Sequence, residues 1–263
     1  MTQPLSPVDA AKFAAAKRAA AIVEDGMKVG LGTGSTAAWL VRCLAERMRE
    51  DNITFTGVPT SSSTASLATE LGIPITTLDD AGWLDLTIDG ADEYDPELNL
   101  IKGGGGALLQ EKIVATASDR MVVIADATKK VATLGAFPLP VEVIGFGMNT
   151  TKRLLEEMLE GLDVMGHQGK FRMKGDELFV TDEGNHILDL HLGRIGNARQ
   201  LALILNQVPG VVENGLFIDI CDVIITGHGE GTVEMRDINS GESESTHIPT
   251  GGSDNVFLNI AEE

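Results

Sequence analysis

The chain has 263 residues, 43% of them hydrophobic, which is enough to bury the core of one large α/β domain or of a domain with a smaller companion. A formal net charge of −19 argues against nucleic acid or an anionic membrane as a partner. Neither Cys43 nor Cys221 has a CxxC spacing, so we expect buried thiols in a reducing cytoplasm rather than a disulfide framework. The sequence predicts neither a signal peptide nor a membrane span of about 18 apolar residues.

In chain order, the first expected element is a helix, with Ser6 as its N-cap, Pro7 in the first turn and an Ala-rich run to about Glu24. A strand, a glycine turn and a second helix follow at 27–31, 32–36 and 37–49. The alternation then continues through expected strands and helices at 55–58, 65–71, 84–88, 107–117 and 121–125. This rhythm predicts a Rossmann-like parallel sheet flanked by helices.

The rhythm changes at about Ala136, where shorter strands are expected among two helices. These elements lie at 140–144, 151–160, 171–173, 178–180, 186–190, 197–206 and near Val211. Their β-α-β-β-α-β order suggests a smaller ferredoxin-like α+β lid domain, and strands at 216–220 and 223–225 are expected to rejoin the main sheet. The predicted domains are a Rossmann-like catalytic domain of 1–135 plus 207–237, a lid of 136–206, and a poorly structured acidic tail of 238–263.

Open parallel sheets bind ligands at the carboxyl ends of their strands, and polar segments follow several of the expected strands. The first is Gly32-Thr33-Gly34-Ser35-Thr36, whose glycines permit close backbone approach. The helix after it offers free N–H groups to an anion, which a protein this acidic would need for binding a phosphorylated substrate. The alternative is a tight strand-to-helix turn with Ser35 or Thr36 as N-cap, since the segment is neither a P-loop nor a full dinucleotide fingerprint.

The second segment, Asp89-Gly90-Ala91-Asp92-Glu93, places three carboxylates within five residues. Asp89 directly ends an apolar strand, a position that normally points into the ligand crevice. A solvated acidic turn and a divalent-cation site are the alternatives. The cation site is the weaker of these because no histidine lies nearby and a lysine follows.

The third segment, Lys102-Gly103-Gly104-Gly105-Gly106-Ala107, sets four glycines before a helix. Such a run is costly in conformational entropy and leaves the backbone open, which favours ligand contact over simple spacing. Lys102 adds a positive charge to the helix N-terminus. Glu111, just over one turn into that helix, is either an ordinary surface glutamate or a carboxylate base kept ionised by these neighbours.

The fourth segment, Asp126-Ala127-Thr128-Lys129-Lys130, follows the strand at 121–125, so Lys129 is a candidate for holding an anionic substrate. A pair of lysines is otherwise usually a solvated face. The five histidines lie outside all four segments and show no metal-ligand spacing. The absence of a Gly-x-Ser-x-Gly elbow gives no support to a serine hydrolase.

Taken together, these motifs resemble in order and spacing those of the ribose-5-phosphate isomerase A family. Segments 137–143, 209–213 and 215–217 match as well, so the likeness covers about residues 8–235. The sequence departs from the family at Leu109-Gln110, where a Thr-Arg pair often precedes the catalytic glutamate. The tail beyond about Asp237 has no counterpart in the family's usual extent.

The resemblance implies an aldose–ketose isomerase of the pentose phosphate pathway that interconverts D-ribose 5-phosphate and D-ribulose 5-phosphate. It implies no metal or organic cofactor, and a homo-oligomer that is usually a dimer. Glu111 would be the proton acceptor, helped by Lys102, with ring opening assigned to Asp89. The implied substrate-binding residues are Thr33, Gly34, Ser35, Thr36, Asp89, Gly90, Ala91, Asp92, Lys102, Gly103, Gly104, Gly105 and Lys129.

Two other classes of protein share related folds. A sugar-phosphate-sensing domain of a transcription regulator would need a basic helix-turn-helix, whereas here the sheet pattern starts at Met27 and the charge is acidic. A coenzyme A transferase would use Glu111 as a nucleophile that forms an acyl intermediate. Trapping such an intermediate with borohydride would distinguish it from the isomerase.

Overall fold

The computed structural model describes residues 5–250, which form two compact units. The first unit comprises residues up to Gly90, 117–128, and the chain from Asp222 onward. The second comprises 91–116 and 129–221, and so is larger than the lid expected at 136–206. Each unit has its own apolar core, because the buried side chains divide into one cluster around Leu40 and Ile88 and another around Val141 and Leu188. None of the helices among the described residues is both long and apolar enough to cross a membrane.

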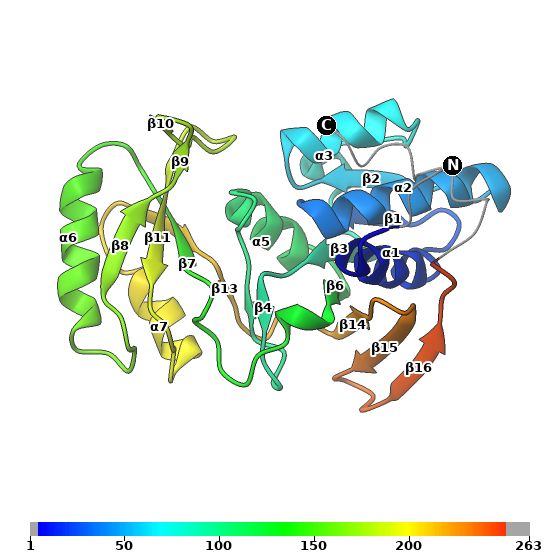
Figure 1. The fold of residues 1–263 in the computed structure, drawn as a ribbon. Coiled ribbons are helices and arrows are strands. Elements are labelled where there is room, and N and C mark those ends of the chain that lie inside the picture. Colours follow the sequence, from blue (N-terminus) through cyan, green and yellow to red (C-terminus); the bar gives the residue numbers. More distant parts are fainter. Residues whose placement is uncertain (1–4, 251–263) are drawn as a thin grey trace. The chain divides into compact units, whose positions relative to one another are not determined.

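The first unit is built on a seven-stranded sheet with the order β16-β15-β14-β6-β3-β1-β2. Its five parallel members are β1 (Lys28–Leu31), β2 (Thr56–Pro59), β3 (Leu86–Gly90), β6 (Met121–Asp126) and β14 (Val223–Gly227). In chain order these strands run 2-1-3-4-5 across the sheet, which is a doubly wound arrangement with its reversal between β1 and β3 (Figure 1). The Rossmann-like prediction is confirmed.

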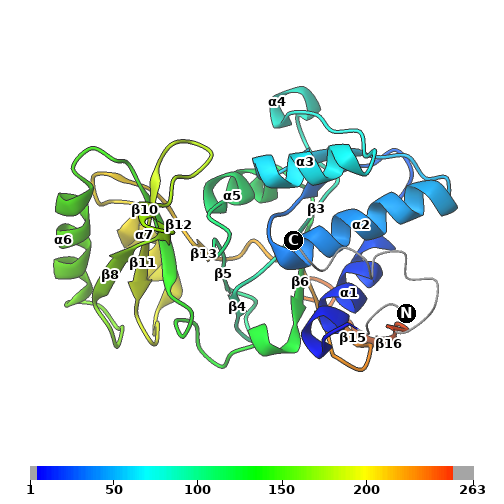
Figure 2. The same ribbon diagram turned by 45° about the horizontal axis from the view of Figure 1, so that its top comes forward.

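The helices of this unit are α1 (Pro7–Ala20), α2 (Ser35–Glu50), α3 (Ser62–Glu70) and the short α4 (Leu78–Ala81). Ser6 caps α1 as expected, since its Oγ accepts the Asp9 N–H at 3.1 Å. The alanines of α1 allow close packing on the sheet, and α1 and α2 lie side by side in Figures 1 and 2. The rings of Phe13 and Trp39 meet edge to face there, with centroids 5.7 Å apart.

The segment after Asp237 differs from the prediction of a poorly structured tail. Strand β15 (Thr232–Asp237) pairs antiparallel with β14, and β16 (Ser243–His247) pairs with β15. The polar composition of β16 concealed this strand, because all five of its residues are exposed and no apolar alternation marks it. The remainder of the predicted tail, 251–263, lies outside the described residues.

The second unit contains a four-stranded antiparallel sheet with two helices. Its elements follow one another as β7 (Leu139–Val143), α6 (Met148–Leu159), β8 (Gln168–Phe171), β11 (His186–His191), α7 (Ala198–Leu205) and β12 (Val211–Asn214). The spatial order β12-β7-β11-β8 places the fourth strand beside the first, which is the ferredoxin-like arrangement that the sequence predicted. Strands β9 (Met173–Lys174) and β10 (Glu177–Leu178) form a separate short hairpin.

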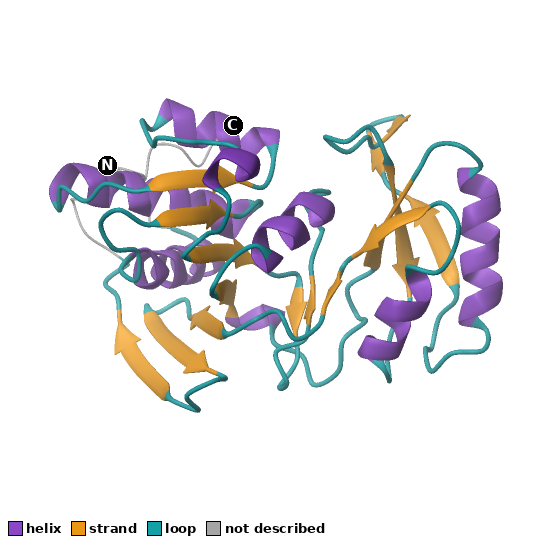
Figure 3. Cartoon of the chain, turned by 180° about the vertical axis from the view of Figure 1, so that it is seen from behind, coloured by secondary structure: helices purple, strands orange, loops and turns teal. Residues whose placement is uncertain are grey.

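A small second sheet of this unit was not predicted. It joins β4 (Glu93–Tyr94), β5 (Leu100–Ile101) and β13 (Leu216–Phe217), and it leads into α5 (Leu108–Thr116); Figure 3 shows its short strands in orange. The expectation that 216–220 would rejoin the main sheet is wrong, because Leu216 and Phe217 pair with Ile101 and Leu100. The 3-10 helix η1 (Ala127–Lys129) spans the boundary between the units.

Candidate active site

In the first unit, the turn after β1 meets the end of β3. Because Leu31 of β1 pairs with Ile88 of β3, the next residue, Gly32, lies against Asp89. A Cβ at position 32 would collide with the Asp89 carboxylate, so only glycine fits there. The buried Asp89 Oδ1 accepts the N–H groups of Thr33 at 3.0 Å and of Gly90 at 2.7 Å. The first two predicted segments are therefore brought together at the switch point of the sheet.

Hydroxyl groups from the end of β2 support the same turn. The Thr33 Oγ1 lies 2.8 Å from both the Thr60 Oγ1 and the Ser61 Oγ, and the Thr64 hydroxyl donates to the Gly32 carbonyl at 2.9 Å. The sequence predicted elements at 55–58 and 65–71 and gave the hydroxyl residues between them no role in a site. Their position directly after a parallel strand was the available signal, because the carboxyl ends of such strands share one edge of the sheet.

The turn ends in the N-terminus of α2. Gly34, at φ 102°, is the N-cap, so the alternative in which Ser35 or Thr36 caps the helix is wrong. The first N–H groups of a helix have no intrahelical partners, and in α2 they include those of the two hydroxyl residues Ser35 and Thr36. Thr36 lies beside Gly90, since a Cβ on Gly90 would be 3.8 Å from the Thr36 Cβ. These groups, all within one unit, form a corner of donors that would suit an anion, and we call it the anion-binding corner.

A cation that sequence reasoning missed completes this corner. The half-buried Lys12 of α1 donates from Nζ to the Ser35 Oγ at 3.0 Å. The sequence offered little indication of a role for Lys12, because a lysine in an Ala-rich helix normally lies on the solvated face of that helix. Only the packing of α1 against α2 places its ammonium group at the glycine turn.

In the second unit, Lys102 and Glu111 form a buried ion pair. The Lys102 Nζ lies 3.4 Å from the Glu111 Oε2, and the two side chains are only 2% and 3% exposed. Lys102 follows β5, and Glu111 lies in the first turn of α5, where the helix dipole favours a carboxylate. The interpretation of Glu111 as a surface glutamate is wrong. Burying two charges costs several kcal/mol per ion, so such a pair is weak evidence for stability and better evidence for a functional site.

The glycine loop 103–106 connects these two residues. Gly103 and Gly106 have φ of 103° and 80°, which is the region that glycine alone enters readily. The exposed Gly104 donates its N–H to the Asp92 Oδ2 at 2.7 Å, so the second half of the acidic segment contacts the loop. The segment 89–93 therefore contributes Asp89 to the first unit and Asp92 to the second.

The ring of Phe217 adds a feature that the sequence did not indicate. The Lys102 Nζ and the Lys112 Nζ lie 5.4 Å and 4.9 Å from its centroid. Lys112 also donates to the Glu213 Oε1 at 2.9 Å and to the Asn214 carbonyl at 2.6 Å. Burial lowers the pKa of Lys112, and the Glu213 carboxylate opposes that shift.

Two other expectations concern single positions. Lys129 ends η1 in the second unit, and its side chain makes no hydrogen bond or ion pair with the described residues of that unit. Gln110, where the family often has arginine, donates to Glu183. Within 5–250, no group of three or more His, Cys, Asp and Glu side chains is arranged to hold a metal ion.

Free helix N–H groups at the switch point of a parallel sheet are typical of α/β proteins that bind phosphorylated ligands. A buried lysine–glutamate pair next to a glycine loop is, separately, typical of an enzyme active site. The family model of ribose 5-phosphate isomerase A (phosphoriboisomerase A) matches residues 56–231. The chain belongs to this family.

Relatives and solved structures agree with this assignment over nearly the whole chain. The ribose-5-phosphate isomerase A proteins of Ruegeria pomeroyi and Jannaschia sp. are 68% and 64% identical over 262 residues, which is 100% of each chain. The structure of ribose 5-phosphate isomerase A from Methanocaldococcus jannaschii has a TM-score of 0.76 and 39% identity, covering 90% of this chain and 98% of that one. A D-ribose-5-phosphate isomerase in complex with phospho-erythronic acid has a TM-score of 0.79 and 36% identity, covering 92% and 100%.

Proposed function

We propose that this chain interconverts D-ribose 5-phosphate and D-ribulose 5-phosphate in the pentose phosphate pathway, with Glu111 as the base that moves the proton. The observation that carries the assignment of Glu111 is the pairing of its carboxylate with Lys102, next to a glycine loop in which Gly104 and Gly105 are exposed. A carboxylate is basic enough for this step only when the developing negative charge is stabilised next to it. Lys102 and the glycine loop are the groups placed to do so.

In the proposed reaction, Glu111 takes the proton from carbon 2 of the open-chain aldose. The electron pair forms a double bond between carbons 1 and 2, and the negative charge moves to the oxygen on carbon 1, where Lys102 stabilises it. Glu111 then returns the proton to carbon 1, the proton of the carbon 2 hydroxyl passes to the carbon 1 oxygen, and the ketose forms. No atom or electron is gained or lost.

Because the sugar exists mostly as a closed ring, a proton must first move from its anomeric hydroxyl to the ring oxygen. We assign this transfer to Asp89, whose carboxylate is held in one orientation by the N–H groups of Thr33 and Gly90. Asp92 is assigned the role of a positioning neighbour, in agreement with its hydrogen bond to Gly104. The backbone of Gly90, Ala91 and 103–105 would contact the sugar.

The phosphate is assigned to the anion-binding corner of the first unit. Thr33, Gly34, Ser35 and Thr36 supply hydroxyl and amide donors, and Lys12 supplies a positive charge. Lys129 stays a candidate for a further cation. A protein with a net charge of −19 repels an anionic substrate unless its binding site is locally positive. Lys12 and the helix N-terminus supply that local positive potential.

The deciding experiment is to incubate the purified, chelator-treated protein with ribose 5-phosphate and measure ketose formation. We expect turnover that is insensitive to the chelator and is lost by at least 100-fold in Glu111→Gln, the lower end of the contribution of a general base. Glu157→Gln, which neutralises an exposed glutamate of the same unit, is the matched control. Near-normal turnover by folded Glu111→Gln would rule out the assignment.

We further assign the protein to the cytoplasm as a homodimer. Phe146, Met165 and Leu203 of the second unit are 91%, 72% and 67% exposed, and we propose that contact with another copy of the chain covers such apolar side chains. Both cysteines are free and buried, as suits a reducing compartment. Light scattering after size-exclusion chromatography tests the dimer, and a monomer at micromolar concentration would contradict it.

A further inference from the structure

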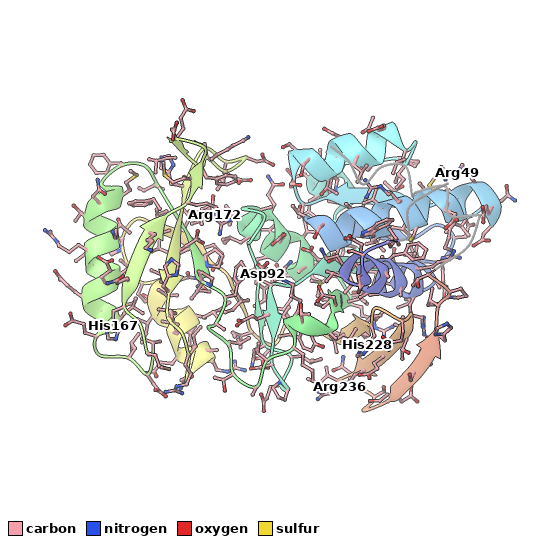
Figure 4. All side chains as sticks on the ribbon, in the orientation of Figure 1. Arg49, Asp92, His167, Arg172, His228 and Arg236 are labelled. Carbon is pink, nitrogen blue, oxygen red and sulfur yellow. The ribbon has the colours of Figure 1, made fainter. Side chains whose placement is uncertain are left out.

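Arg172, which the motifs did not indicate, connects the ferredoxin-like sheet to the glycine loop (Figure 4). It lies between β8 and β9, and its guanidinium reaches both Asp189 of β11 and the backbone of Gly103 and Gly104. We infer that Arg172 is a positioning residue that fixes the peptide planes of the glycine loop for the proton transfer. This inference rests on the proposed function.

All three nitrogen atoms of the guanidinium are engaged. Nε and Nη2 form a two-pronged ion pair with the Asp189 carboxylate, at 3.0 Å to Oδ2 and 2.5 Å to Oδ1. Nη1 donates to the carbonyl oxygens of Gly103 at 2.8 Å and Gly104 at 2.9 Å. Such a planar fork suits arginine and not lysine, whose ammonium is a single point of charge. Because the Asp189 carboxylate neutralises its charge, Arg172 is suited to hold the loop rather than to bind the substrate.

Phe179 supports the same arrangement from the hairpin. The Arg172 guanidinium lies 5.9 Å from the centroid of its ring, and the Phe179 N–H donates to the Arg172 carbonyl at 2.9 Å. The ring also occupies the place where a Cβ on Gly106 would be. Both ends of the glycine loop are therefore in contact with this pair of side chains.

The contacts decide which way the loop amides point. The peptide between Gly103 and Gly104 is held at both ends, since Arg172 binds its carbonyl and the Asp92 Oδ2 accepts its N–H at 2.7 Å. In the next peptide, Arg172 binds the Gly104 carbonyl, so the trans geometry turns the N–H of Gly105 to the opposite side.

A run of glycines has more backbone freedom than any other sequence, so its amides are preorganised only if something outside the run holds them. Donors that stabilise an oxyanion work because they need no reorganisation during the reaction. We call the contacts of Arg172 with the carbonyl oxygens of Gly103 and Gly104 the clamp. Losing the clamp should lower kcat, whereas the anion-binding corner, which belongs to the other unit, keeps its own contacts.

The test compares Arg172→Lys, Arg172→Gln and Asp189→Asn with a matched control, Arg153→Lys, which alters an exposed arginine paired with Glu157. We expect kcat for ribose 5-phosphate to fall about 100-fold in both Arg172 variants, as for a misplacement of about 1 Å, with KM changing less than about threefold. In Asp189→Asn, kcat should also fall, but by a smaller factor. In the control, kcat and KM should both stay at the wild-type values.

Two further measurements separate positioning from a general structural role. The carboxylate of phospho-erythronic acid holds two oxygens in one plane on its terminal carbon, where the enediolate has one oxygen on each of carbons 1 and 2. The acid therefore imitates the planar pair of oxygens, and its inhibition constant should rise in step with the loss of kcat. Hydrogen exchange of the amides in 103–106 should accelerate in the Arg172 variants, while the melting temperature stays within a few degrees of the wild type.

Arg172→Lys with normal kcat would overturn the inference, and so would a loss of kcat with unchanged inhibitor affinity and unchanged exchange in the loop. The exchange measurement does not depend on activity. If the wild type fails to isomerise ribose 5-phosphate while the Arg172 variants still loosen 103–106, the proposed function fails and the clamp on the loop stands.

Discussion

Lys102 and Glu111 face each other at 3.4 Å between Nζ and Oε2, with both side chains almost completely shielded from water. If a substitution removes one of these charges, the other stays buried and loses the opposite charge that it faces. This relationship links the proposed chemistry to the stability of the second unit, and it yields a prediction that does not depend on turnover.

We expect Lys102→Met to destabilise the protein by about 3 kcal/mol, since breaking a buried pair leaves an uncompensated charge. Lys102→Met combined with Glu111→Gln should be more stable than Lys102→Met alone, although it should be as inactive as either single variant. Urea unfolding followed by circular dichroism measures both effects. A double variant that is destabilised by the sum of the single effects would contradict the account of the pair.

Lys12→Met should weaken binding of the phosphate. Loss of a charge-assisted hydrogen bond of about 1.5 kcal/mol corresponds to an increase of roughly tenfold in KM, with kcat little changed because the ammonium is assigned to ground-state binding. Inhibition by inorganic phosphate should weaken in parallel. Lys17→Met, on the same helix and paired at 3.6 Å with Glu46, is the control. An unchanged KM in Lys12→Met would exclude Lys12 from the phosphate site.

Gly32→Ala should inactivate the enzyme, because its Cβ would displace the Asp89 carboxylate from the N–H groups that hold it. Overpacking of this kind costs about 1–3 kcal/mol, which thermal unfolding would detect. At Gly161 the nearest atom to an added Cβ is the Met158 carbonyl at 3.7 Å, an ordinary contact, so Gly161→Ala should stay active and stable. Full activity of Gly32→Ala would show that the position of Asp89 is not critical.

The pH dependence of stability should report on Glu142 of β7, which is completely buried and accepts hydrogen bonds from Thr181 and Asn185, each at 2.9 Å. Burial raises the pKa of Glu142, an effect that these two hydrogen bonds oppose. The folded protein therefore binds this proton more tightly than the unfolded chain. Stability from this group is fully present below the unfolded-state pKa of about 4.3 and is lost as the pH rises through the folded-state pKa.

The Glu142→Gln side chain is neutral at every pH, so the free energy of unfolding of the variant minus that of the wild type should increase from pH 4 to pH 8. Urea titrations at several pH values measure the difference. The exposed Glu157→Gln should show a nearly constant difference instead. If Glu142→Gln behaved in the same way, the carboxyl group would not be titrating differently in the folded state.

Much of this protein is determined by local sequence. Alternating apolar strands and amphipathic helices predicted the doubly wound sheet and the ferredoxin-like order, because burial on a sheet or helix face imposes a period on neighbouring residues. The glycines at 32, 34, 103, 104 and 106 were also found from the sequence, because the backbone conformation or a close approach at each of these positions excludes a side chain. The motifs also sufficed to predict the family.

Only the tertiary structure decided which groups meet. Lys12 is 23 residues from Ser35, and Arg172 is 69 residues from Gly103, so nothing in the local pattern pairs them. Strand β13 pairs with β5, and the polar β16 pairs with β15. The backbone N–H and C=O groups of a strand need hydrogen-bond partners, and the packing of the whole fold determines which strand supplies them. Sequence periodicity records which face of an element is buried, whereas contacts between distant segments depend on how whole elements pack.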